Sequence, residues 1–368
     1  MRASIIISIG IIATALALGC KKAKDTDNPF TPVPPPSDLK KDILSDLATD
    51  VIYNTYNDLA AKSDQLYTAI GTFSTSNSTN DLNAARQAWR DTRSAWEQSE
   101  GFLFGPVSTD NIDPRIDTWP INYNSLDSIL ASSATLDATY VNNLEEALKG
   151  FHPIEYLLFG TNGNKQPADF TARELQFLLA LADNLKTLTH SVKSSWDASA
   201  SGNYSSKFTS AGSGSSEYPT IRSAYEEVTN AAIDICDEVA NEKIQTPFSA
   251  HDASLEESPY AKNSFTDFIN NIKSVQNIYL GRYTTDGVTT DGKGLEDLIK
   301  GNNLSMDGQI KTKLNNALNA LNNIPVPFGE AVTQSQYYTQ VANAQTAIND
   351  LKDYLQLTVL PYVQTLTN

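Results

Sequence analysis

The sequence has few of the side chains on which hydrolytic enzymes most often depend. It contains three histidines and two cysteines in 368 residues. No HExxH or HxxEH pair is present, because Tyr156 follows Glu155 where the second histidine of the latter motif would stand. No GxSxG nucleophile motif occurs, and the histidines have no recognisable triad context. These absences argue against the usual zinc, serine and cysteine peptidase mechanisms, although distant carboxylates could still complete a hydrolytic site.

Basic residues are scarce relative to acidic ones. Lys and Arg together number 27 against 43 Asp and Glu, which gives a formal net charge of −16 at pH 7. A body of this charge lacks the basic surface that nucleic-acid binding requires. It attracts cations and basic partners instead. We therefore expect no nucleic-acid partner.

Long apolar runs are missing after the first nineteen residues. Residues 3–19, ASIIISIGIIATALALG, follow Arg2 and are too short and too poorly flanked for a membrane span, but they match the apolar region of a secretory signal. The sequence LALGC, which ends at Cys20, resembles the bacterial lipobox, in which the cysteine is lipidated. Ala17 replaces the more usual leucine of that motif. An ordinary signal peptide with an incidental cysteine is the alternative.

These features predict how the chain begins and where it is located. Residues 1–19 are predicted to be a lipoprotein signal peptide, and residues 20–37, rich in proline and charge, an extended tether. Acyl chains on Cys20 would anchor the mature chain without a spanning helix. We therefore expect a bacterial cell-envelope protein, lipid-anchored to the outer membrane and either facing the periplasm or exposed at the surface. Loss of Arg2 with the signal changes the formal charge from −16 to −17.

The other cysteine, Cys236, has no intramolecular partner once Cys20 is acylated, so no disulfide is expected. It lies on an apolar helical face with Ala232 and Val239. We expect a small buried hydrophobic side chain there and not a reactive thiol.

Apolar residues recur at helical spacing along almost the whole chain and almost never alternate strictly. The predicted fold class is therefore all-α. Residues 201–217 are rich in serine and glycine and carry no such periodicity, which makes them the best candidate for an interdomain loop. We expect two packed helical-bundle domains, residues 38–200 and 218–368, with the loop between them.

Two helix starts can be predicted from capping residues. Asp81 is expected to be the N-cap of a helix that carries two tryptophans a heptad apart. Thr171 and Glu174 form a capping-box pattern at the start of a long helix.

The stretch GFHPIEYLLFG, residues 150–160, places a histidine three residues before a glutamate at a helix start. Gly150 suits the left-handed position after the preceding helix, and Pro153 is tolerated only in the first turn of a new one. His152 and Glu155 therefore share one helical face, with Cβ atoms ~5–6 Å apart. The pair is either a capping carboxylate hydrogen-bonded to its neighbour or two ligands of a metal site, which would need further ligands from elsewhere.

The other two histidines are less informative. His190 lies in the middle of a predicted helix and is expected on the surface or at an interface. His251 opens a loop with several acidic residues and could approach a site, but a solvated loop is the default interpretation.

The stretch GFHPIEYLLFG resembles the GxHxxE signature of the imelysin-like family. AWRDTRSAWEQSEGFLFGPV and IDPRIDTWPINYNSLDSIL resemble blocks of the family's first domain, and LEESPYAKNSFTDFINNIKSVQNIYLG and GKGLEDLI with IPVPF resemble blocks of its second. The matches follow the family's order and cover most of the chain after residue 80. The resemblance implies two helical bundles with the motif facing a cleft between them, an envelope location, often as a lipoprotein, and a link to bacterial iron acquisition. Some relatives are described as peptidases.

The resemblance also implies a set of site residues. Carried over by position, the motif residues are Gly150, His152 and Glu155. We expect His152 and Glu155, together with Glu100, to bind the metal or ligand, and we assign no catalytic residue. Segments from both domains are expected to line the same cleft through Ser99, Arg115, Glu257, Ser258 and Ser264. For these five and for Glu100 the alternative is a solvated side chain or a helix cap.

Three classes of function remain open. A metal- or ligand-binding protein is favoured, because carboxylates with one imidazole suit iron, with zinc or calcium as alternatives. Its ligand would be iron, haem or a small chelate, and its further partners iron-transport or receptor components. A metal-dependent peptidase of the imelysin type is the alternative, so catalysis is neither asserted nor excluded. The third class is a metal-free binder of peptide or glycan, yet the tyrosines that could serve it, Tyr53, Tyr56 and Tyr67, lie on core-like stripes.

Overall fold

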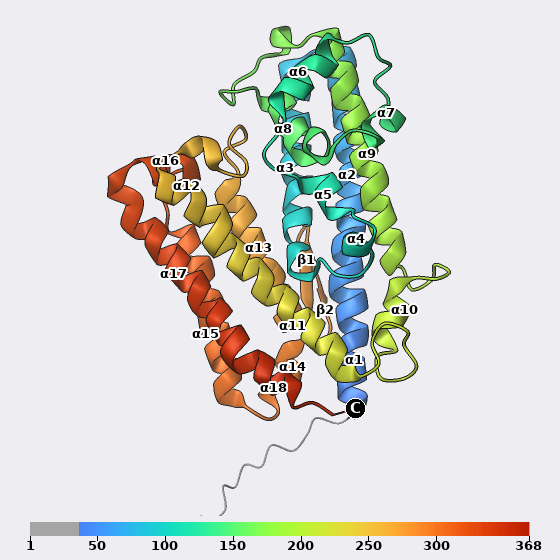
Figure 1. Cartoon of the computed structure of the whole chain (residues 1–368), viewed down its shortest axis with the longest axis vertical. Coiled ribbons are helices and arrows are strands. Elements are labelled where there is room, and N and C mark those ends of the chain that lie inside the picture. The colour runs from blue at the N-terminus through green and yellow to red at the C-terminus, as the bar shows by residue number, and fades with distance from the viewer. Residues whose placement is uncertain (1–36, 368) are drawn as a thin grey trace, which may run out of the picture. The chain divides into compact units, whose positions relative to one another are not determined.

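The computed structural model describes residues 37–367, so the predicted signal peptide, Cys20 and nearly all of the tether lie outside the described residues. The described residues belong to one compact unit. They are predominantly helical, which confirms the fold class expected from the spacing of apolar residues (Figure 1). None of the described helices is both long and apolar enough to cross a membrane.

Three long helices form the first group of packed elements. α2 (Asn54–Ser76) packs against both α3 (Thr79–Glu97) and α9 (Ala172–Trp196), and the three run side by side (Figure 1). The heptad spacing of Trp89 and Trp96 places both rings on the inner face of α3, where each is 0 % exposed. In typical cores, replacing such a ring by alanine costs about 3–5 kcal/mol, so these two residues hold α3 in place.

Four further helices form the second group, α11 (Ile221–Glu238), α13 (Ser264–Leu280), α15 (Leu304–Asn322) and α17 (Tyr338–Tyr354). α15 packs against α13 and α17, and α17 also packs against α11. α13 lies against α3 of the first group as well (Figure 1). The contact between α3 and α13 therefore joins the two groups, and the candidate site described below lies there.

The proposed interdomain loop lies between these groups along the chain. Residues 201–217 include a short helix, α10 (Tyr204–Thr209). The first described helix, α1 (Ser37–Asp46), packs against α11 and against α14 (Leu295–Lys300), which are elements of the C-terminal half. The division into two domains at this loop stays a prediction.

Short elements occupy the connections between the long helices. The short α-helices are α4 (Pro106–Thr109), α5 (Asp113–Asp117), α6 (Tyr123–Ala131), α7 (Ala138–Asn142), α8 (Phe151–Phe159), α12 (Gln245–Ala250), α16 (Phe328–Thr333) and α18 (Leu360–Gln364). The 3₁₀ turns are η2 (Glu100–Phe102), η3 (Glu146–Leu148), η4 (Pro167–Asp169), η6 (Ala253–Leu255) and η7 (Ser335–Tyr337). Three segments are π-helical, η1 (Leu47–Tyr53), η5 (Val239–Ile244) and η8 (Leu355–Val359). π-Helical turns are rare in proteins and are frequent at functional sites.

A small antiparallel hairpin interrupts the helical pattern. β1 (Arg282–Thr285) pairs with β2 (Val288–Asp291), with Tyr283 opposite Thr290. Asp286 and Gly287 connect the strands, and both have positive φ. The sequence analysis did not predict this hairpin, although an Asp-Gly pair between two β-branched stretches is a strong hairpin signal.

The observed helix starts match the capping predictions in part. The Thr171 hydroxyl accepts a hydrogen bond from the Glu174 N–H at 3.1 Å and completes the predicted capping box. The prediction for Asp81 was wrong by three residues, because Ser78 is the N-cap of α3 and its hydroxyl accepts from the Asp81 N–H. Asp81 instead stands in the first turn and accepts hydrogen bonds from the Ser76 and Ser78 hydroxyls.

Cys236 has the buried position expected of it. Its side chain is free and 0 % exposed on α11. Burial raises the pKa of its thiol to about 12. Because the thiolate is the reactive form, this cysteine acts as a small hydrophobic residue at neutral pH.

Candidate metal-binding site

The position of the GxHxxE motif depends on Gly150, the N-cap residue of α8. Its φ is +82°, which disfavours any residue with a Cβ. A Cβ built there would lie within 3.0 Å of the carbonyl oxygen of Ile116, a residue of α5. The glycine therefore allows the start of α8 to contact the end of α5. This contact places His152 of α8 beside Asp117 of α5.

His152 is 1 % exposed and lies between two carboxylates. Its Nε2 is 3.1 Å from Asp117 Oδ1, and its Nδ1 is 3.8 Å from Glu155 Oε2. Neither ring nitrogen makes a well-aligned hydrogen bond within residues 37–367. Burial alone would lower the pKa of His152, but the Asp117 and Glu155 carboxylates raise it above its usual value. The ring of Trp119 covers the imidazole, with 5.1 Å between the centroids.

Glu155 divides its two oxygens between two roles. Oε1 accepts hydrogen bonds from the backbone N–H groups of Tyr260 at 2.9 Å and Ala261 at 2.7 Å. This oxygen therefore holds the segment before α13 against α8. Oε2, which faces His152, has no hydrogen-bond partner in the described part of the chain. Oε1 of Glu155 thus has a structural role, as in the capping interpretation of the His–Glu pair. Oε2 remains available for the ligand interpretation.

A fully buried arginine of α3, Arg93, organises the carboxylates around the motif. Its Nη2 lies 2.6 Å from Glu97 Oε1 and 2.9 Å from Glu257 Oε1, and its Nε lies 3.7 Å from Asp267 Oδ1. Its Nη1 pairs with Asp117. A charge with no exposed surface needs such partners, because an unpaired buried charge costs several kcal/mol. Arg93 thereby brings together side chains from α3, α5, α13 and the segment before α13.

Asp117 connects this arginine to the histidine. One oxygen, Oδ1, faces both Arg93 and His152, and the other accepts a hydrogen bond from Trp96 Nε1 at 2.7 Å. Burial would raise the pKa of Asp117, but the Arg93 guanidinium and His152 outweigh it and hold the pKa well below the usual value. Asp117 is therefore ionised at neutral pH.

Two further acids of α3 and η2 face Asp117. Glu97 is 0 % and Glu100 6 % exposed, and one oxygen of each lies within 4.8 Å of an Asp117 oxygen and of the other. Asn271 Nδ2 donates to Glu97 Oε2 at 2.6 Å and to Glu100 Oε2 at 2.8 Å, which holds the two carboxylates together. Burial raises the pKa of Glu97 and of Glu100 well above the usual value. Removal of their protons therefore requires a compensating positive charge.

These side chains fit a hard metal ion. Glu97, Glu100 and Asp117 offer three carboxylate oxygens in one place, and His152 adds an imidazole nitrogen next to Asp117. Oxygen ligands with one imidazole suit iron or manganese better than metals that prefer thiolate. The unpartnered nitrogens of His152 are the second indication, because buried polar atoms normally have hydrogen-bond partners.

A lysine, Lys243, lies against the same carboxylates. Its Nζ is 2.9 Å from Glu100 Oε2, 2.9 Å from Glu257 Oε1 and 4.0 Å from Glu97 Oε2. Glu257 Oε1 therefore bridges Lys243 and Arg93. Burial would lower the pKa of Lys243, but the surrounding carboxylates raise it well above its usual value.

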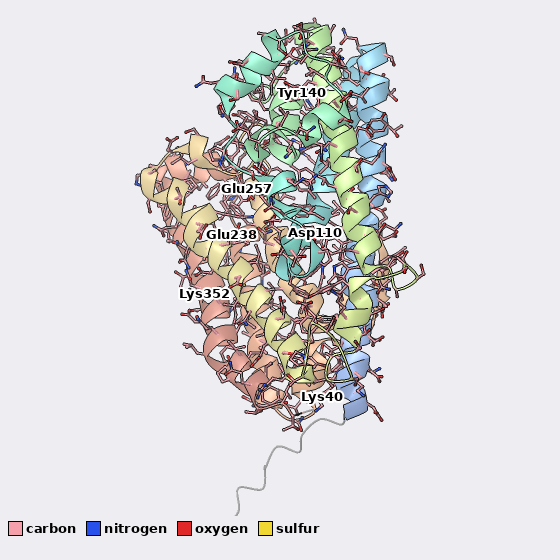
Figure 2. All side chains as sticks on the ribbon, turned by 45° about the vertical axis from the view of Figure 1, so that its right-hand side comes forward. Lys40, Asp110, Tyr140, Glu238, Glu257 and Lys352 are labelled. Carbon is pink, nitrogen blue, oxygen red and sulfur yellow. The ribbon has the colours of Figure 1, made fainter. Side chains whose placement is uncertain are left out.

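A cavity of about 430 Å³ leads from the surface to this cluster. Its walls include Glu100, Asp117 and Lys243 from the cluster, together with Asp113, Glu238 and Glu242. Burial and the nearby charge of Asp117 raise the pKa of Asp113 to about 6. Glu257, at the cluster, and Glu238, on α11, are labelled in Figure 2. The acidic lining gives a cation a favourable route inward.

A second cavity, of about 790 Å³, lies next to the first and shares Trp119, Pro120 and Ser254 with it. Its wall includes three tyrosines, in which the ring of Tyr156 makes edge-to-face contact with those of Tyr123 and Tyr260, and the hydroxyls of Tyr123 and Tyr260 are hydrogen-bonded to each other. Trp119 lies against His152 and lines both cavities.

The structure brings several sequence-predicted residues to the cluster or directly beneath it. Glu257 reaches Arg93 and Lys243, as described above. Ser99 is buried and donates to the Trp96 carbonyl oxygen. Ser258 donates to Asp267 Oδ2 at 2.6 Å, and Ser264 donates to Glu256 Oε2 at 2.9 Å. These three serines therefore orient neighbouring groups and do not face the metal ligands directly.

Arg115 is placed elsewhere. Its Nη2 donates to Asn142 Oδ1 at 2.6 Å on the outer side of α5, and it lines neither of the two cavities described above. The side chains of α5 point in different directions, so Asp117 turns inward while Arg115 turns outward. The arginine of the site is Arg93, not Arg115.

The other two histidines lie outside the cluster. His190 is exposed on α9, with its Nε2 3.0 Å from Asp64 Oδ2. His251 ends α12 in a left-handed conformation and stacks on Tyr338 at 4.5 Å between centroids. Neither is positioned to bind a metal with His152.

The sequence analysis missed Arg93, Glu97, Asp117, Lys243 and Asn271 as site residues. For Arg93 and Glu97 a signal was present, because both follow Trp89 at helical spacing on the apolar face of α3. A charge on such a face predicts a buried ion pair. For Asp117, Lys243 and Asn271 no local pattern marks them, since their partners come from distant segments.

Comparison with known proteins places this chain in a family. The family model described as imelysin (Peptidase_M75) matches residues 52–355. Iron-regulated protein A of Synechococcus elongatus is 34 % identical over 315 residues, which cover 85 % of this chain and 84 % of that protein. The crystal structure of an iron-regulated protein A precursor from Parabacteroides distasonis has a TM-score of 0.80 at 26 % identity, over 91 % of this chain and 97 % of that one. An imelysin-like protein from Psychrobacter arcticum, with a TM-score of 0.70 at 15 % identity over 90 % of this chain and 97 % of that one, shows likeness of fold alone.

The matched region contains every residue of the carboxylate cluster, from Arg93 to Asn271. It also contains Gly150, His152 and Glu155. Both the sequence relative and the structural relatives match the chain over most of its length. The protein is therefore a member of the imelysin family.

Proposed function

We propose that this protein binds an iron ion through Glu97, Glu100, Asp117 and His152 and takes part in iron uptake. The observation that carries the proposal is the convergence of three carboxylate oxygens beside a buried imidazole whose nitrogens lack hydrogen-bond partners among the described residues. The family's relatives named iron-regulated protein A support an iron-related role. The net charge of −16 also favours cation capture.

A bare ion or a small chelate fits this site better than haem. Asp117 and Glu155 flank His152, whose side chain is 1 % exposed, and the ring of Trp119 covers it. A haem iron would have to reach a histidine nitrogen that faces a carboxylate. The cavity of about 430 Å³, in contrast, reaches Glu100 and Asp117 directly. A small hydrated or chelated ion can therefore enter without rearrangement of α5.

Binding also fits better than proteolysis. A metallopeptidase needs a carboxylate that is free to take a proton from metal-bound water. Glu155 is 0 % exposed and lines neither of the two cavities described above, its Oε1 accepts two backbone hydrogen bonds, and its Oε2 faces His152. We therefore keep the imelysin-type peptidase as the alternative and propose ligand capture as the function.

We further propose that the mature chain is anchored in the cell envelope by lipid on Cys20. The lipobox-like LALGC sequence and the Pro-rich segment that follows it support this location. An envelope address suits a protein that collects iron before transport, with iron-transport or receptor components as partners. We expect metabolic labelling with a radioactive fatty acid to label the parent chain. The Cys20→Ser variant should not be labelled. Labelling that survives the substitution would contradict the anchor.

The metal site can be tested with residues 21–368, which include every described residue. We expect anaerobic Fe²⁺ or Mn²⁺ to bind with about 1:1 stoichiometry and to change the fluorescence of Trp96 and Trp119, which contact Asp117 and His152. His152→Ala and Asp117→Asn should each weaken binding at least tenfold, measured by isothermal titration calorimetry.

His190→Ala is the matched control, because this histidine also lies beside an aspartate but is exposed. It should leave the affinity unchanged. Equal affinity in the His152→Ala protein and the parent would contradict the proposed site. Chelator-sensitive cleavage of a denatured protein, abolished by Glu155→Ala, would favour the peptidase alternative.

A further inference from the structure

Lys243 lies in η5, one of the three π-helical segments among the described residues. Its side chain is 10 % exposed and its ammonium contacts Glu100 and Glu257, each at 2.9 Å, with Glu97 at 4.0 Å. Two of these three acids, Glu97 and Glu100, belong to the candidate metal site. The ammonium is a compact point charge, so it neutralises these acids from a position next to the one that a metal ion would occupy.

The Lys243 ammonium and a metal ion would repel each other if both were bound to the same carboxylates. Glu100 Oε2 is bound to the ammonium, and a metal ion on the Glu100 carboxylate would lie within a few ångströms of a second positive charge. An ion of charge two or three would also supply the compensation that Lys243 now provides. Arg93 cannot yield in the same way, because its three guanidinium nitrogens face four different carboxylates. Lys243 is the cation of the cluster that can leave.

The π-helical turn gives Lys243 a second partner nearer the surface. Glu238 stands five residues earlier, and its Oε1 is 3.4 Å from Lys243 Nζ. Residues at this spacing do not share a face in an α-helix, whereas the wider π turn aligns them. The Glu238 side chain is 46 % exposed and lines the entrance cavity. A displaced ammonium can therefore move toward solvent and remain paired.

We propose that Lys243 is an internal counter-ion that is displaced from Glu100 and Glu257 toward Glu238 when a metal ion binds. This inference rests on the proposed function and adds a determinant of affinity and ion selectivity. Displacement of the ammonium opposes metal binding, so the site holds its ion less tightly than its ligands alone would. Ions of charge two or three compete with the lysine better than monovalent ions do. A protein that captures an ion and later releases it benefits from such a moderated affinity.

The test compares the Mn²⁺ affinity of residues 21–368 with that of three variants. Lys243→Gln removes the competing charge and should bind Mn²⁺ at least tenfold more tightly than the parent. Lys243→Arg keeps the charge and should show no gain. Lys352→Gln is the matched control, because it removes a partly buried lysine that pairs with Asp237 at 3.0 Å outside the cluster. It should leave the affinity within about twofold of the parent, since both changes shift the net charge equally.

Chemical labelling of the unmodified protein gives a second measurement that does not depend on the folding of a variant. An amine-reactive acetylating reagent followed by peptide mass spectrometry should modify Lys243 poorly in metal-free protein and severalfold more at saturating Mn²⁺. Labelling of Lys352 should not change. Unchanged or reduced labelling of Lys243 on Mn²⁺ binding would overturn the proposal.

The outcomes separate this inference from the proposed function. If the parent binds Mn²⁺ and Lys243→Gln binds it no more tightly, only the role of Lys243 is wrong. If neither the parent nor Lys243→Gln binds Mn²⁺ or anaerobic Fe²⁺, both the proposed function and the inference are wrong. Binding by Lys243→Gln alone would show that the ammonium is not displaced in the parent, which would contradict both the proposed function and the displacement.

Discussion

The chain contains two histidine–aspartate pairs with nearly the same separation and very different surroundings. His152 Nε2 lies 3.1 Å from Asp117 Oδ1, and His190 Nε2 lies 3.0 Å from Asp64 Oδ2. The side chains of the first pair are 1 % and 7 % exposed, whereas those of the second are 46 % and 51 % exposed. Distance alone therefore does not distinguish a site from a surface ion pair.

The difference lies in what surrounds each pair. Solvent screens the interaction between His190 and Asp64, and such exposed pairs contribute only about 0–1 kcal/mol. Around His152 and Asp117 there is little solvent, so every charge needs a partner within the protein. Arg93 supplies one partner to Asp117, and Trp96 supplies another. Burial converts a local pair into a network in which one change affects all members.

Removal of the central cation should affect the buried pair most strongly. Arg93→Met removes the guanidinium that pairs with Asp117 and Glu97, and we expect a loss of about 3–5 kcal/mol in the free energy of unfolding. Urea unfolding followed by circular dichroism measures this loss. Arg222→Met, which removes an exposed arginine 3.8 Å from Glu226, should change the stability by less than about 0.5 kcal/mol. A loss below about 1 kcal/mol for Arg93→Met would show that the network is not needed for folding.

A change at Gly150 should separate His152 from Asp117 without altering either side chain. Gly150→Ala adds backbone strain and a clash with the Ile116 carbonyl oxygen, for which we expect a loss of about 2–4 kcal/mol. Metal binding should be lost as well, and both effects can be measured on one preparation by thermal unfolding and calorimetry.

Gly202→Ala is the control for this prediction. Gly202 also has a positive φ, of +72°, but a Cβ there meets no atom within 4 Å. Gly202→Ala should therefore lower the free energy of unfolding only by the cost of backbone strain, about 1–2 kcal/mol, and should retain metal binding. Equal losses in the two variants would mean that close contact between α8 and α5 is not what places His152.

The hydrogen bond of Trp96 to Asp117 should contribute more than a similar bond to a neutral acceptor. Trp96→Phe removes a donor to a carboxylate, worth about 1.5–3 kcal/mol. Trp89→Phe removes a donor to the Phe151 carbonyl oxygen at 3.1 Å, worth about 0.5–1.5 kcal/mol. Denaturant unfolding of both variants gives the comparison. A larger loss for Trp89→Phe would contradict the view that charge on Asp117 strengthens its hydrogen bonds.

A substitution in the exposed pair of His190 and Asp64 should have the smallest effect on stability. Asp64→Asn is expected to change the free energy of unfolding by less than about 0.5 kcal/mol, and the small effect should disappear in concentrated salt. The unfolding midpoint at low and high ionic strength measures it. A salt-independent loss above about 1 kcal/mol would remove the distinction between the two pairs.

Local parts of the fold could be predicted because they depend on neighbours in the sequence. The helical period of apolar residues indicated the all-α fold, and the capping box at Thr171 was correctly identified. The motif residues Gly150, His152 and Glu155 were singled out from their spacing within one segment. The Asp286–Gly287 turn could have been predicted by the same kind of rule.

The partners of the motif could not be predicted, because they are distant along the chain. Asp117 comes from α5, one of the short elements between α3 and α8, Lys243 from the π-helical segment η5 and Asn271 from α13. Nothing in their local sequence distinguishes them from the many other acidic, basic and amide side chains. Arg93 and Glu97 form the intermediate case, because their position on the apolar face of α3 indicated burial but not the identity of their partners.

The sequence by itself determined that this chain is helical, that α8 starts beside a glycine, and that an imidazole and a carboxylate project from the same face of that helix. Only the tertiary structure decided that Asp117 lies beside the imidazole, that Glu97 and Glu100 lie beside Asp117, and that Arg93 and Lys243 balance the charge of these acids. The physical reason is that helical period and capping act over a few residues, whereas burial removes solvent from groups 143 to 164 residues apart and forces them to neutralise one another.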